Sequence, residues 1–321
     1  MEVYETLKEI VGKENVLTEE PLKRHTTFRI GGPAKYFVTP ENFGQLGELL
    51  LLCKEKKIAY QLIGNGSNLL EPDEGFDGIV ICTHKPDVEM SIVKDIRAKQ
   101  PELHEILFQK EPEADGNVIV TAGAGVMLSV LAARLAERGL AGFAFASGIP
   151  GTLGGAVTMN AGAYGGEIKD CILEAQIMQP GGEICTLDKK ALQLGYRTSI
   201  LQKEEWILLS AVFSFEQGVK EDIQGKMREL NEKRREKQPL EYGSAGSTFK
   251  RPEGHFAGKL IEDAGLRGYR VGDIMVSEKH CGFVVNVGNG TEKQAKQVIE
   301  HVQKTVQDKF GILLEPEVRI L

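Results

Sequence analysis

The sequence has few cysteines, no metal-ligand pattern and no excess of basic charge. Its cysteines are odd in number, lie far apart and form no Cys-x-x-Cys pair: Cys53, Cys82, Cys171, Cys185 and Cys281. We therefore expect reduced thiols rather than a disulfide framework or a zinc site. The six histidines have no ligand spacing either, so we predict no metal. The formal net charge of −7 argues against a general nucleic-acid binder or membrane-surface binder.

Long apolar runs and a targeting signal are also absent. No uninterrupted apolar stretch approaches the roughly 18 residues that cross a bilayer. Residues 1–16, MEVYETLKEIVGKENV, are amphipathic and acidic, with no basic segment leading into an apolar run. We expect a cytoplasmic monomer without membrane insertion or a nucleic-acid partner.

Two common phosphate-binding motifs are missing as well. No G-x-x-x-x-G-K-[ST] occurs, which excludes a P-loop. GNGSNL, residues 64–69, begins like G-x-G-x-x-G, but Leu69 stands at the third glycine and an acidic stretch follows. A Rossmann dinucleotide site is therefore disfavoured.

What is present is an alternation of strand-like and helix-like patterns in a chain of 321 residues, 41% of them hydrophobic. Such a chain can bury one large core or two to three modest ones. β-Branched and aromatic runs predict strands over 57–64, 78–82, 117–123, 206–215 and 281–287. Apolar spacing predicts helices over 127–142 and 291–311, the second with Thr291 and Gln294 spaced as a capping box.

Two polar regions interrupt this alternation. Residues 220–239 are strongly charged, with only Ile223, Met227 and Leu230 at helical spacing, and predict a solvated helix just after a domain boundary. Residues 85–115 are polar, contain proline and end in acidic residues, so we expect an inserted hairpin or surface loop there.

Glycine is concentrated in four turns. Seven of the twenty residues from 148 to 167 are glycine, and RIGGPA (29–34), GNGSNLL (64–70) and TAGAGV (121–126) add three more glycine-rich stretches. Glycine lets consecutive amides approach a ligand without an intervening Cβ, so backbone N–H groups alone can bind a pyrophosphate. Any single loop of this kind is more often a tight turn in a β-rich fold. Four such loops, two with Asn and Ser interleaved, favour a dinucleotide.

The candidate cofactor contacts fall in two groups. The first follows a predicted strand and comprises Gly64, Asn65, Gly66, Ser67, Asn68 and Leu69. The second would line an extended groove, with the Asn160 side chain as donor and acceptor beyond it; it comprises Ser147, Gly148, Ile149, Pro150, Gly154, Gly155, Asn160, Gly162 and Ala163.

Six motifs occur in a specific order: HTTFRIGGPA, GNGSNLL, SGIPGTLGGAVTMNAGAYGGE, GYRTS, GSTFKRPEGHFAGKLIEDAGLRG and EPEVR. From about Leu22 to Arg319 the chain resembles the UDP-N-acetylenolpyruvoylglucosamine reductase family, the FAD- and NADPH-dependent enzymes of bacterial peptidoglycan precursor synthesis. The likeness is weaker over 85–115. The short form of the fifth motif is similar to the type that lacks an extra tyrosine-bearing substrate loop.

The resemblance implies an α+β fold of the vanillyl-alcohol-oxidase-like (PCMH-type) flavoproteins, with two FAD-binding subdomains and a C-terminal α+β substrate-binding domain. Residues 1–83 and 312–321 would form the first FAD-binding subdomain and residues 84–218 the second. Residues 219–311 would form the substrate-binding domain. NADPH and the UDP-sugar are expected to use one cleft in turn, with the flavin storing the hydride between them.

The reduction of an enolpyruvyl ether requires side chains of particular types. Hydride delivered to the terminal carbon of an enolpyruvyl ether pushes negative charge into the carboxylate, which requires a cation, a hydrogen-bond donor and a proton for the adjacent carbon. Arg197 in GYRTS can grip a carboxylate with two hydrogen bonds. By the resemblance, Glu317 in EPEVR is the catalytic glutamate, and Ser247 in AGSTFK is the proton donor.

Alternatives stay open for each of these residues. Glu315 lies on the same face as Glu317 if the stretch is extended. Ser244 offers a second serine in the same motif, although the Phe and Lys after Ser247 favour the latter. Taken alone, Arg197 could form a surface salt bridge, Ser247 a turn and Glu317 a solvated strand carboxylate. A protonated Glu317 beside the developing charge is a hypothesis.

Substrate anchoring and two competing functions complete the expectations. Candidate contacts for a UDP-sugar are Tyr196, Lys250, Arg251, His255 and Lys259. One competing function is another FAD-linked oxidase or dehydrogenase of the same fold, acting on a hydroxy acid or sugar lactone. The other is a non-catalytic module that binds flavin or a nucleotide sugar.

Overall fold

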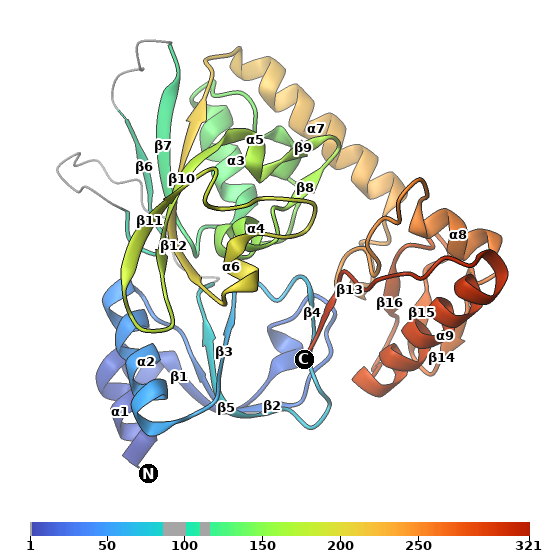
Figure 1. Ribbon diagram of the computed structural model, residues 1–321, viewed down its shortest axis with the longest axis horizontal. Coiled ribbons are helices and arrows are strands. Elements are labelled where there is room, and N and C mark those ends of the chain that lie inside the picture. Colours follow the sequence, from blue (N-terminus) through green and yellow to red (C-terminus); the bar gives the residue numbers. More distant parts are fainter. Residues whose placement is uncertain (1, 86–100, 110–115) are drawn as a thin grey trace. The chain divides into compact units, whose positions relative to one another are not determined.

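The computed structural model describes residues 2–85, 101–109 and 116–321 (Figure 1). The chain divides into two compact units, each assembled from three separate stretches. The first unit comprises Met1–Leu17, Phe37–Gly64 and Ile79–Glu232, and the second comprises Thr18–Tyr36, Asn65–Gly78 and Lys233–Leu321. The three-part division expected from the resemblance has other boundaries and stays a prediction.

The largest sheet belongs to the first unit and is antiparallel throughout. Its strand order is β11-β10-β12-β7-β6. The bounds are β6 Ile106–Phe108, β7 Val118–Gly123, β10 Ile172–Met178, β11 Ile184–Asp188 and β12 Ile207–Phe215. The strands predicted over 117–123 and 206–215 are thus confirmed. β12 lies in the middle of the sheet and is buried along most of its length because it has a partner on each side.

Short helices share the core of this sheet, and a small hairpin contacts the 3-10 turn at Ala144–Ala146. They are α3 Leu128–Glu137, α4 Leu153–Thr158, β8 Gly162–Ala163, β9 Gly166–Glu167, α5 Ile168–Cys171 and α6 Ile200–Lys203. α4 and α5 contact β12. α3 buries Leu128, Leu131, Ala132 and Leu135, the face predicted from apolar spacing. Beneath them Phe143, Phe145, Phe213 and Phe215 form a buried aromatic cluster.

A second sheet runs in the order β1-β2-β5-β3. Its strands are β1 Val16–Pro21, β2 Pro33–Val38, β3 Tyr60–Ile63 and β5 Phe76–Cys82. β3 and β5 are parallel, with Tyr60 opposite Ile79, and fulfil the strand predictions for 57–64 and 78–82. The helices α1 Glu2–Val11 and α2 Phe43–Lys56 contact each other in the first unit. Single 3-10 turns occur at Lys13–Asn15, Leu22–Arg24 and Ala144–Ala146.

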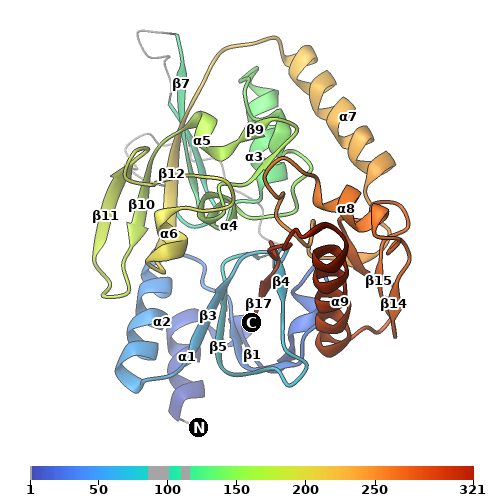
Figure 2. The same cartoon turned by 45° about the vertical axis from the view of Figure 1, so that its right-hand side comes forward.

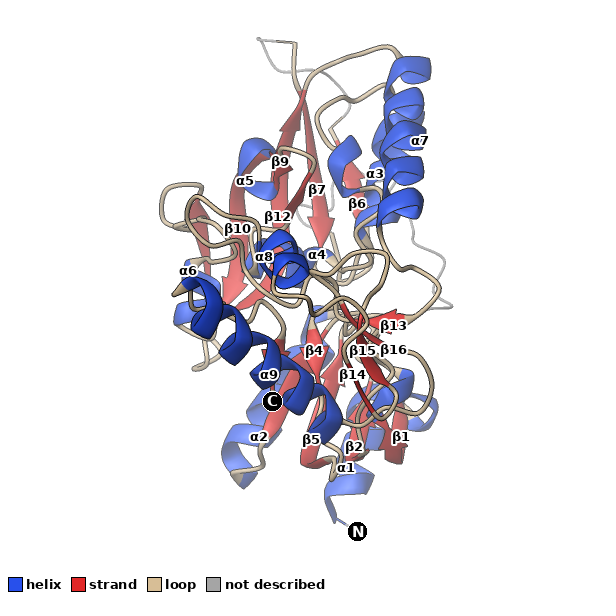
Figure 3. Ribbon diagram, turned by 90° about the vertical axis from the view of Figure 1, so that its right-hand side faces the viewer, coloured by secondary structure: helices blue, strands red, loops and turns tan. Residues whose placement is uncertain are grey.

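The second unit contains an antiparallel sheet covered by a long helix. Its strand order is β13-β16-β15-β14. The elements are β13 Gly243–Ser244, α8 Ala257–Asp263, β14 Arg270–Val271, β15 Ile274–Val276, β16 Val284–Asn286 and α9 Glu292–Phe310. α9 contacts β14, β15 and β16 (Figure 3). The predicted capping box of Thr291 and Gln294 is present, and α9 ends at Gly311, whose φ of 70° suits glycine.

The chain ends on a strand that returns to an early segment. β17 Arg319–Ile320 pairs in parallel with β4 Leu69–Leu70, with Arg319 opposite Leu69 (Figure 2). This pairing brings the EPEVR motif to the residues that directly follow the GNGSN loop. The last motif and the second motif are therefore neighbours in space, although about 250 residues separate them in the chain.

The two polar regions have different outcomes. α7 Lys220–Lys237 is the predicted charged helix, and Leu230 is its buried residue. The division between the units falls inside it, between Glu232 and Lys233. Of residues 85–115, the stretches 86–100 and 110–115 lie outside the described residues. The described part is not simply a surface loop, because it contains the edge strand β6 and the fully buried Leu103.

Candidate active site

Arg197 lies on a tight turn of the first unit. The residues at the base of the turn, Gly195 and Thr198, bond to each other: the Gly195 N–H donates to the Thr198 carbonyl at 3.0 Å. Arg197 has a φ of 55°, which the third position of a type II turn requires and which arginine rarely adopts. The turn therefore presents Tyr196 and Arg197 side by side. The Tyr196 ring centroid is 5.1 Å from the guanidinium carbon.

The Arg197 side chain is held against the β8–β9 hairpin. Its Nη2 donates to the Gly162 carbonyl at 3.2 Å. Glu167 ends the same hairpin, and its Oε2 is 2.8 Å from the Lys169 ammonium. The pKa of Glu167 is held below its ordinary value, chiefly by the Lys169 hydrogen bond against the opposing effect of burial, with smaller effects of Asn160 and the Arg197 charge. Glu167 is therefore an anion at neutral pH.

Asn160 is fully buried, with a φ of 43°, and its side chain makes three hydrogen bonds within the protein. Its Nδ2 donates to the Gly195 carbonyl and to Glu167 Oε2, both at 2.9 Å. Its Oδ1 accepts the Lys169 N–H at 2.9 Å. Both amide hydrogens are thus bonded inside the protein. The cofactor contact expected of this side chain from the sequence stays a prediction.

The rest of the glycine-rich run is largely bonded to its own unit. The Ser147 and Ile149 amides donate to the Ala144 and Ala146 carbonyls at 3.2 and 3.0 Å. The Gly154 amide donates to the Ala124 carbonyl at 2.8 Å, and a Cβ on Gly154 would lie 3.3 Å from that oxygen. A Cβ on Gly155 would meet only Thr152 Oγ1, at 3.9 Å, so this position borders open space.

The GNGSN loop is divided between the units, after Gly64. In the first unit, Gly64 packs so closely on the Thr152 side chain that a Cβ would clash with it. In the second unit, Gly66 has a φ of 54° and packs against the His25 carbonyl. Among the described residues, no acceptor is found for the backbone N–H groups of Gly66, Ser67 and Asn68. Three consecutive free donors are compatible with a bound pyrophosphate, and the pyrophosphate site expected from the sequence at this loop stays a prediction.

Ser247 precedes a segment that the second unit holds from both sides. Thr248 is buried; its N–H donates to the Gly282 carbonyl, and its Oγ1 accepts the Val284 N–H, both at 2.9 Å. Its carbonyl accepts the Glu317 N–H at 2.8 Å. Ser247 itself is exposed and follows Gly246, whose φ of 79° turns the chain. The serine hydroxyl is thus carried at the surface by a rigid neighbour.

Glu317 is fixed through its backbone on two sides. Besides the bond to Thr248, its carbonyl accepts the Asn68 Nδ2 at 3.0 Å. Ser247, Glu317 and the end of the GNGSN loop are therefore brought together by adjacent backbone segments. Glu315 differs: it is exposed, and its Oε2 is 3.2 Å from Lys250 Nζ. This ion pair and the half-buried position of Glu317 favour Glu317 as the functional carboxyl.

The predicted substrate contacts of the second unit lie on one loop and the helix that follows it: Lys250, which is half-buried, and Arg251, His255 and Lys259, which are exposed. The Arg251 guanidinium carbon is 3.9 Å from the Phe256 ring centroid, and the ring is 62% exposed. Lys259 Nζ is 2.6 Å from Asp263, one turn further along α8. His255 is exposed. Because exposed ion pairs contribute only about 0–1 kcal/mol, these cations can exchange their partners for phosphate oxygens.

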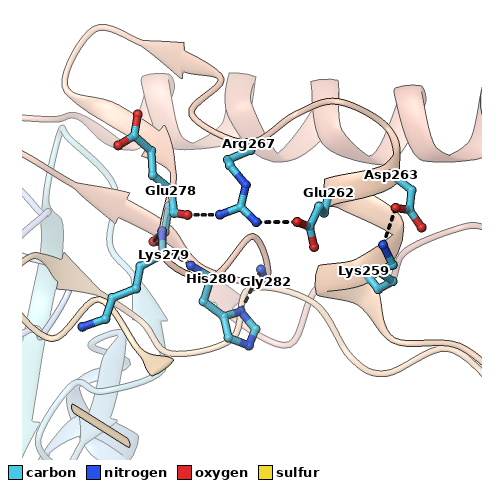
Figure 4. A network of polar contacts seen from close by, with 9 residues as sticks. Lys259, Glu262, Asp263, Arg267, Glu278, Lys279, His280 and Gly282 are labelled. Carbon is cyan, nitrogen blue, oxygen red and sulfur yellow. Dashed lines mark hydrogen bonds and ion pairs between the residues drawn. The ribbon is translucent and has the colours of Figure 1, made fainter. Parts of the chain in front are cut away.

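A polar network supports this part of the second unit (Figure 4). Arg267 donates to the Glu278 carbonyl and lies 2.5 Å from Glu262 Oε1, so it links α8 to the loop that precedes β16. In that loop the His280 Nδ1 accepts the Gly282 N–H at 3.0 Å. Burial lowers the pKa of His280, which favours the neutral ring that this bond needs. The network thereby fixes the residue whose carbonyl holds Thr248.

Three supporting residues were not identified from the sequence. Thr248 anchors the Ser247 segment, Ser199 follows the Arg197 turn with its Oγ 2.7 Å from the Thr158 carbonyl, and Glu167 faces Arg197. For Glu167 a signal exists: Glu167 and Asp170 have the spacing of a capping box, and the reciprocal bonds are present. A lone Thr or Ser in a short motif carries no such signal.

Predictions were also made from the sequence about cysteines, metal-ligand clusters and membrane-spanning helices, and the structure can be compared with each of them. All five cysteines are free, and Cys185 is the one that is not buried. No cluster of His, Cys, Asp or Glu that could hold a metal is found in the part of the chain that the structure describes. In the same residues, no helix is both long enough and apolar enough to traverse a bilayer.

Comparison with known proteins identifies the family. The model of the UDP-N-acetylenolpyruvoylglucosamine reductase C-terminal domain matches residues 238–321, and an FAD binding domain matches residues 102–188. A relative named UDP-N-acetylenolpyruvoylglucosamine reductase from Lachnoclostridium phytofermentans is 49% identical, covering 99% of this chain and 97% of its own. The relative of the same name from Agathobacter rectalis is 50% identical, covering 95% and 94%.

A solved structure agrees with these relatives. The crystal structure of the reductase from Thermus caldophilus has a TM-score of 0.72 at 31% identity and covers 95% of this chain and 97% of its own. The predicted α+β FAD-binding fold with a C-terminal reductase domain is confirmed. The resemblance stated from the six motifs is confirmed with it. The chain belongs to the UDP-N-acetylenolpyruvoylglucosamine reductase family.

Proposed function

We propose that this protein is an FAD- and NADPH-dependent reductase that converts UDP-N-acetylglucosamine enolpyruvate to UDP-N-acetylmuramate in peptidoglycan precursor synthesis. Family membership over nearly the whole chain supports the proposal. The observation that carries it is the 2.8 Å hydrogen bond from the Glu317 N–H to the carbonyl of Thr248, the residue after Ser247. It joins the segments of the carboxyl and the hydroxyl that the second half of the reaction needs.

When bound, FAD supplies a two-electron carrier between NADPH and the terminal carbon of the enolpyruvyl group. We assign the free amides of Gly66, Ser67 and Asn68 to its pyrophosphate. Further cofactor contacts are assigned to the glycine-rich run of the first unit, where Gly155 borders open space. The remaining chemistry belongs to this chain's own side chains.

Arg197 binds the substrate carboxylate in this proposal. Its planar fork suits two parallel hydrogen bonds to a carboxylate, and those bonds strengthen as negative charge develops there. Glu317, in its protonated form, donates a hydrogen bond to the same charge. Ser247 gives its hydroxyl proton to the adjacent carbon, which is basic enough to accept it from a weak acid.

The uridine diphosphate part of the substrate is assigned to five side chains at the protein surface. Lys250, Arg251, His255 and Lys259 contribute positive charge or donors from one loop and helix of the second unit. Tyr196 contributes an exposed ring beside Arg197 in the first unit. We also propose a cytoplasmic monomer, which light scattering behind a sizing column tests directly.

One experiment tests the function. An absorption spectrum of the purified protein should show bound flavin, anaerobic NADPH should bleach it, and UDP-N-acetylglucosamine enolpyruvate should restore the colour. Bleaching by an alcohol or lactone donor, with no response to NADPH, would instead support another FAD-linked oxidase. Bound flavin that neither donor reduces would support a binding module. A protein that takes up no FAD contradicts the proposal altogether.

A further inference from the structure

The turn that carries Arg197 is tied down at both ends by buried polar side chains. On one side the Asn160 Nδ2 donates to the Gly195 carbonyl at 2.9 Å. On the other, the Ser199 Oγ donates to the Thr158 carbonyl at 2.7 Å. Asn160 and Ser199 are both fully buried. Buried hydrogen bonds of this kind are costly to break, because the partner left behind finds no water.

The same framework also reaches the guanidinium. Asn160 bonds to Glu167 Oε2 and to the Lys169 N–H, and so fixes the end of the β8–β9 hairpin. The Gly162 carbonyl of that hairpin accepts the Arg197 Nη2 at 3.2 Å. One amide side chain thus connects the backbone of the Arg197 turn to the hairpin that holds the Arg197 side chain.

We propose that Asn160 and Ser199 are positioning residues that hold the Arg197 guanidinium in the geometry needed to bind the substrate carboxylate. The inference rests on the function proposed above and adds residues to it. Arg197 is in a strained backbone conformation, which persists only where its surroundings enforce it. A guanidinium fork displaced by even about 1 Å loses its match to a carboxylate. Asn160 accordingly acts through Arg197.

Asn160→Asp is the sharpest test of this idea. Aspartate has the same shape and tolerates a positive φ, so the backbone is not strained further. It loses both donors, however, and turns a carboxylate toward the Gly195 carbonyl and the Glu167 carboxylate. The introduced carboxylate should repel both the Gly195 carbonyl and the Glu167 carboxylate. The turn that carries Arg197 would then lose its attachment on this side.

Two ligands that differ in the carboxylate provide the readout. UDP-N-acetylmuramate carries the carboxylate that Arg197 would bind, whereas UDP-N-acetylglucosamine lacks it. Titrations of the flavin-loaded protein should show Asn160→Asp weakening UDP-N-acetylmuramate by about 10- to 100-fold, the cost of a charge-assisted interaction. The affinity for UDP-N-acetylglucosamine, the flavin content and flavin reduction by NADPH should change by less than about twofold on the same reasoning.

Two further variants separate positioning from general damage. Asn42→Asp makes the same charge change at the N-cap of α2, where an aspartate accepts the Gln45 N–H equally well, and should bind both ligands like the wild type. Asn160→Asp combined with Glu167→Gln exchanges amide and carboxylate and restores one hydrogen bond at unchanged charge. The exchange should recover part of the UDP-N-acetylmuramate affinity.

The outcomes are distinct. Equal weakening of both ligands, or loss of flavin from Asn160→Asp, overturns the inference, and flavin loss would favour a direct cofactor contact. Should Asn160→Asp fail to fold, Ser199→Ala decides: a loss of about three- to tenfold, confined to UDP-N-acetylmuramate, supports positioning, and no loss contradicts it. If NADPH does not reduce the flavin of the wild-type protein and UDP-N-acetylmuramate does not bind to it, the proposed function itself is overturned.

Discussion

Ser247→Ala should separate catalysis from stability. Ser247 is exposed, and no hydrogen bond of its side chain is found among the described residues. The backbone bonds that hold its neighbour Thr248 do not involve the Ser247 side chain. Alanine should therefore cost less than about 0.5 kcal/mol, or less than about 2 °C in Tm. Removing a general acid, in contrast, slows the step that uses its proton by about 100- to 10,000-fold, or roughly 3–5 kcal/mol in the barrier.

Anaerobic stopped-flow measurements resolve the two half-reactions. Bleaching of the flavin by NADPH should be unchanged in Ser247→Ala, whereas recolouring by the enolpyruvyl substrate should be slowed. Ser244→Ala is the matched control: Ser244 lies three residues earlier in β13 and pairs through its backbone with Val285, which alanine preserves. Equal slowing of both half-reactions, or the same defect in Ser244→Ala, would refute the proton-donor role of Ser247.

Three other perturbations have defined outcomes. Gly154→Val should destabilise the first unit by about 1–3 kcal/mol and lower the flavin absorbance per protein, because its side chain crowds the Ala124 carbonyl; unchanged absorbance and Tm would contradict this. The pKa of Glu167 is lowered from 4.5, so its contribution to stability is complete above that pH and is lost as the pH falls through the folded-state value. Tm should therefore fall on acidification less steeply in Glu167→Gln than in the wild type. Identical slopes of Tm against pH would argue against a stabilising role of the ionised Glu167. Thr291→Ala removes the capping box of α9 and should cost about 1 kcal/mol in urea unfolding, whereas Thr291→Ser should not.

Much of the local structure was predictable from the sequence. Strands β7 and β12 and helices α3, α7 and α9 follow from apolar periodicity, and the ends of α9 follow from Thr291 and Gly311. Periodicity works for β7, β12, α3 and α9 because each of them buries one face, or both, in a core. α7 was instead predicted from its high charge and three apolar residues at helical spacing, and it buries Leu230 alone. The burial and the strand pairing of residues 101–109 were not predicted. Leu103 and Ile106 are buried in the core of the first unit, and β6 pairs with β7; a polar stretch of sequence does not reveal such partners.

The sequence alone determined the family and the three candidate catalytic residues, because six motifs in a fixed order carry that information without any knowledge of distances. It left open whether Glu315 or Glu317 is the functional carboxyl. The tertiary structure favours Glu317, which is half-buried, over Glu315, which is exposed and paired with Lys250. The backbone of Glu317 also bonds to Thr248 and Asn68, residues remote in sequence. The structure also showed that the two amide hydrogens of Asn160 are donated to the Gly195 carbonyl and to the Glu167 carboxylate. A hydrogen bond between distant segments depends on how the chain folds back on itself, and local residue patterns do not encode that return.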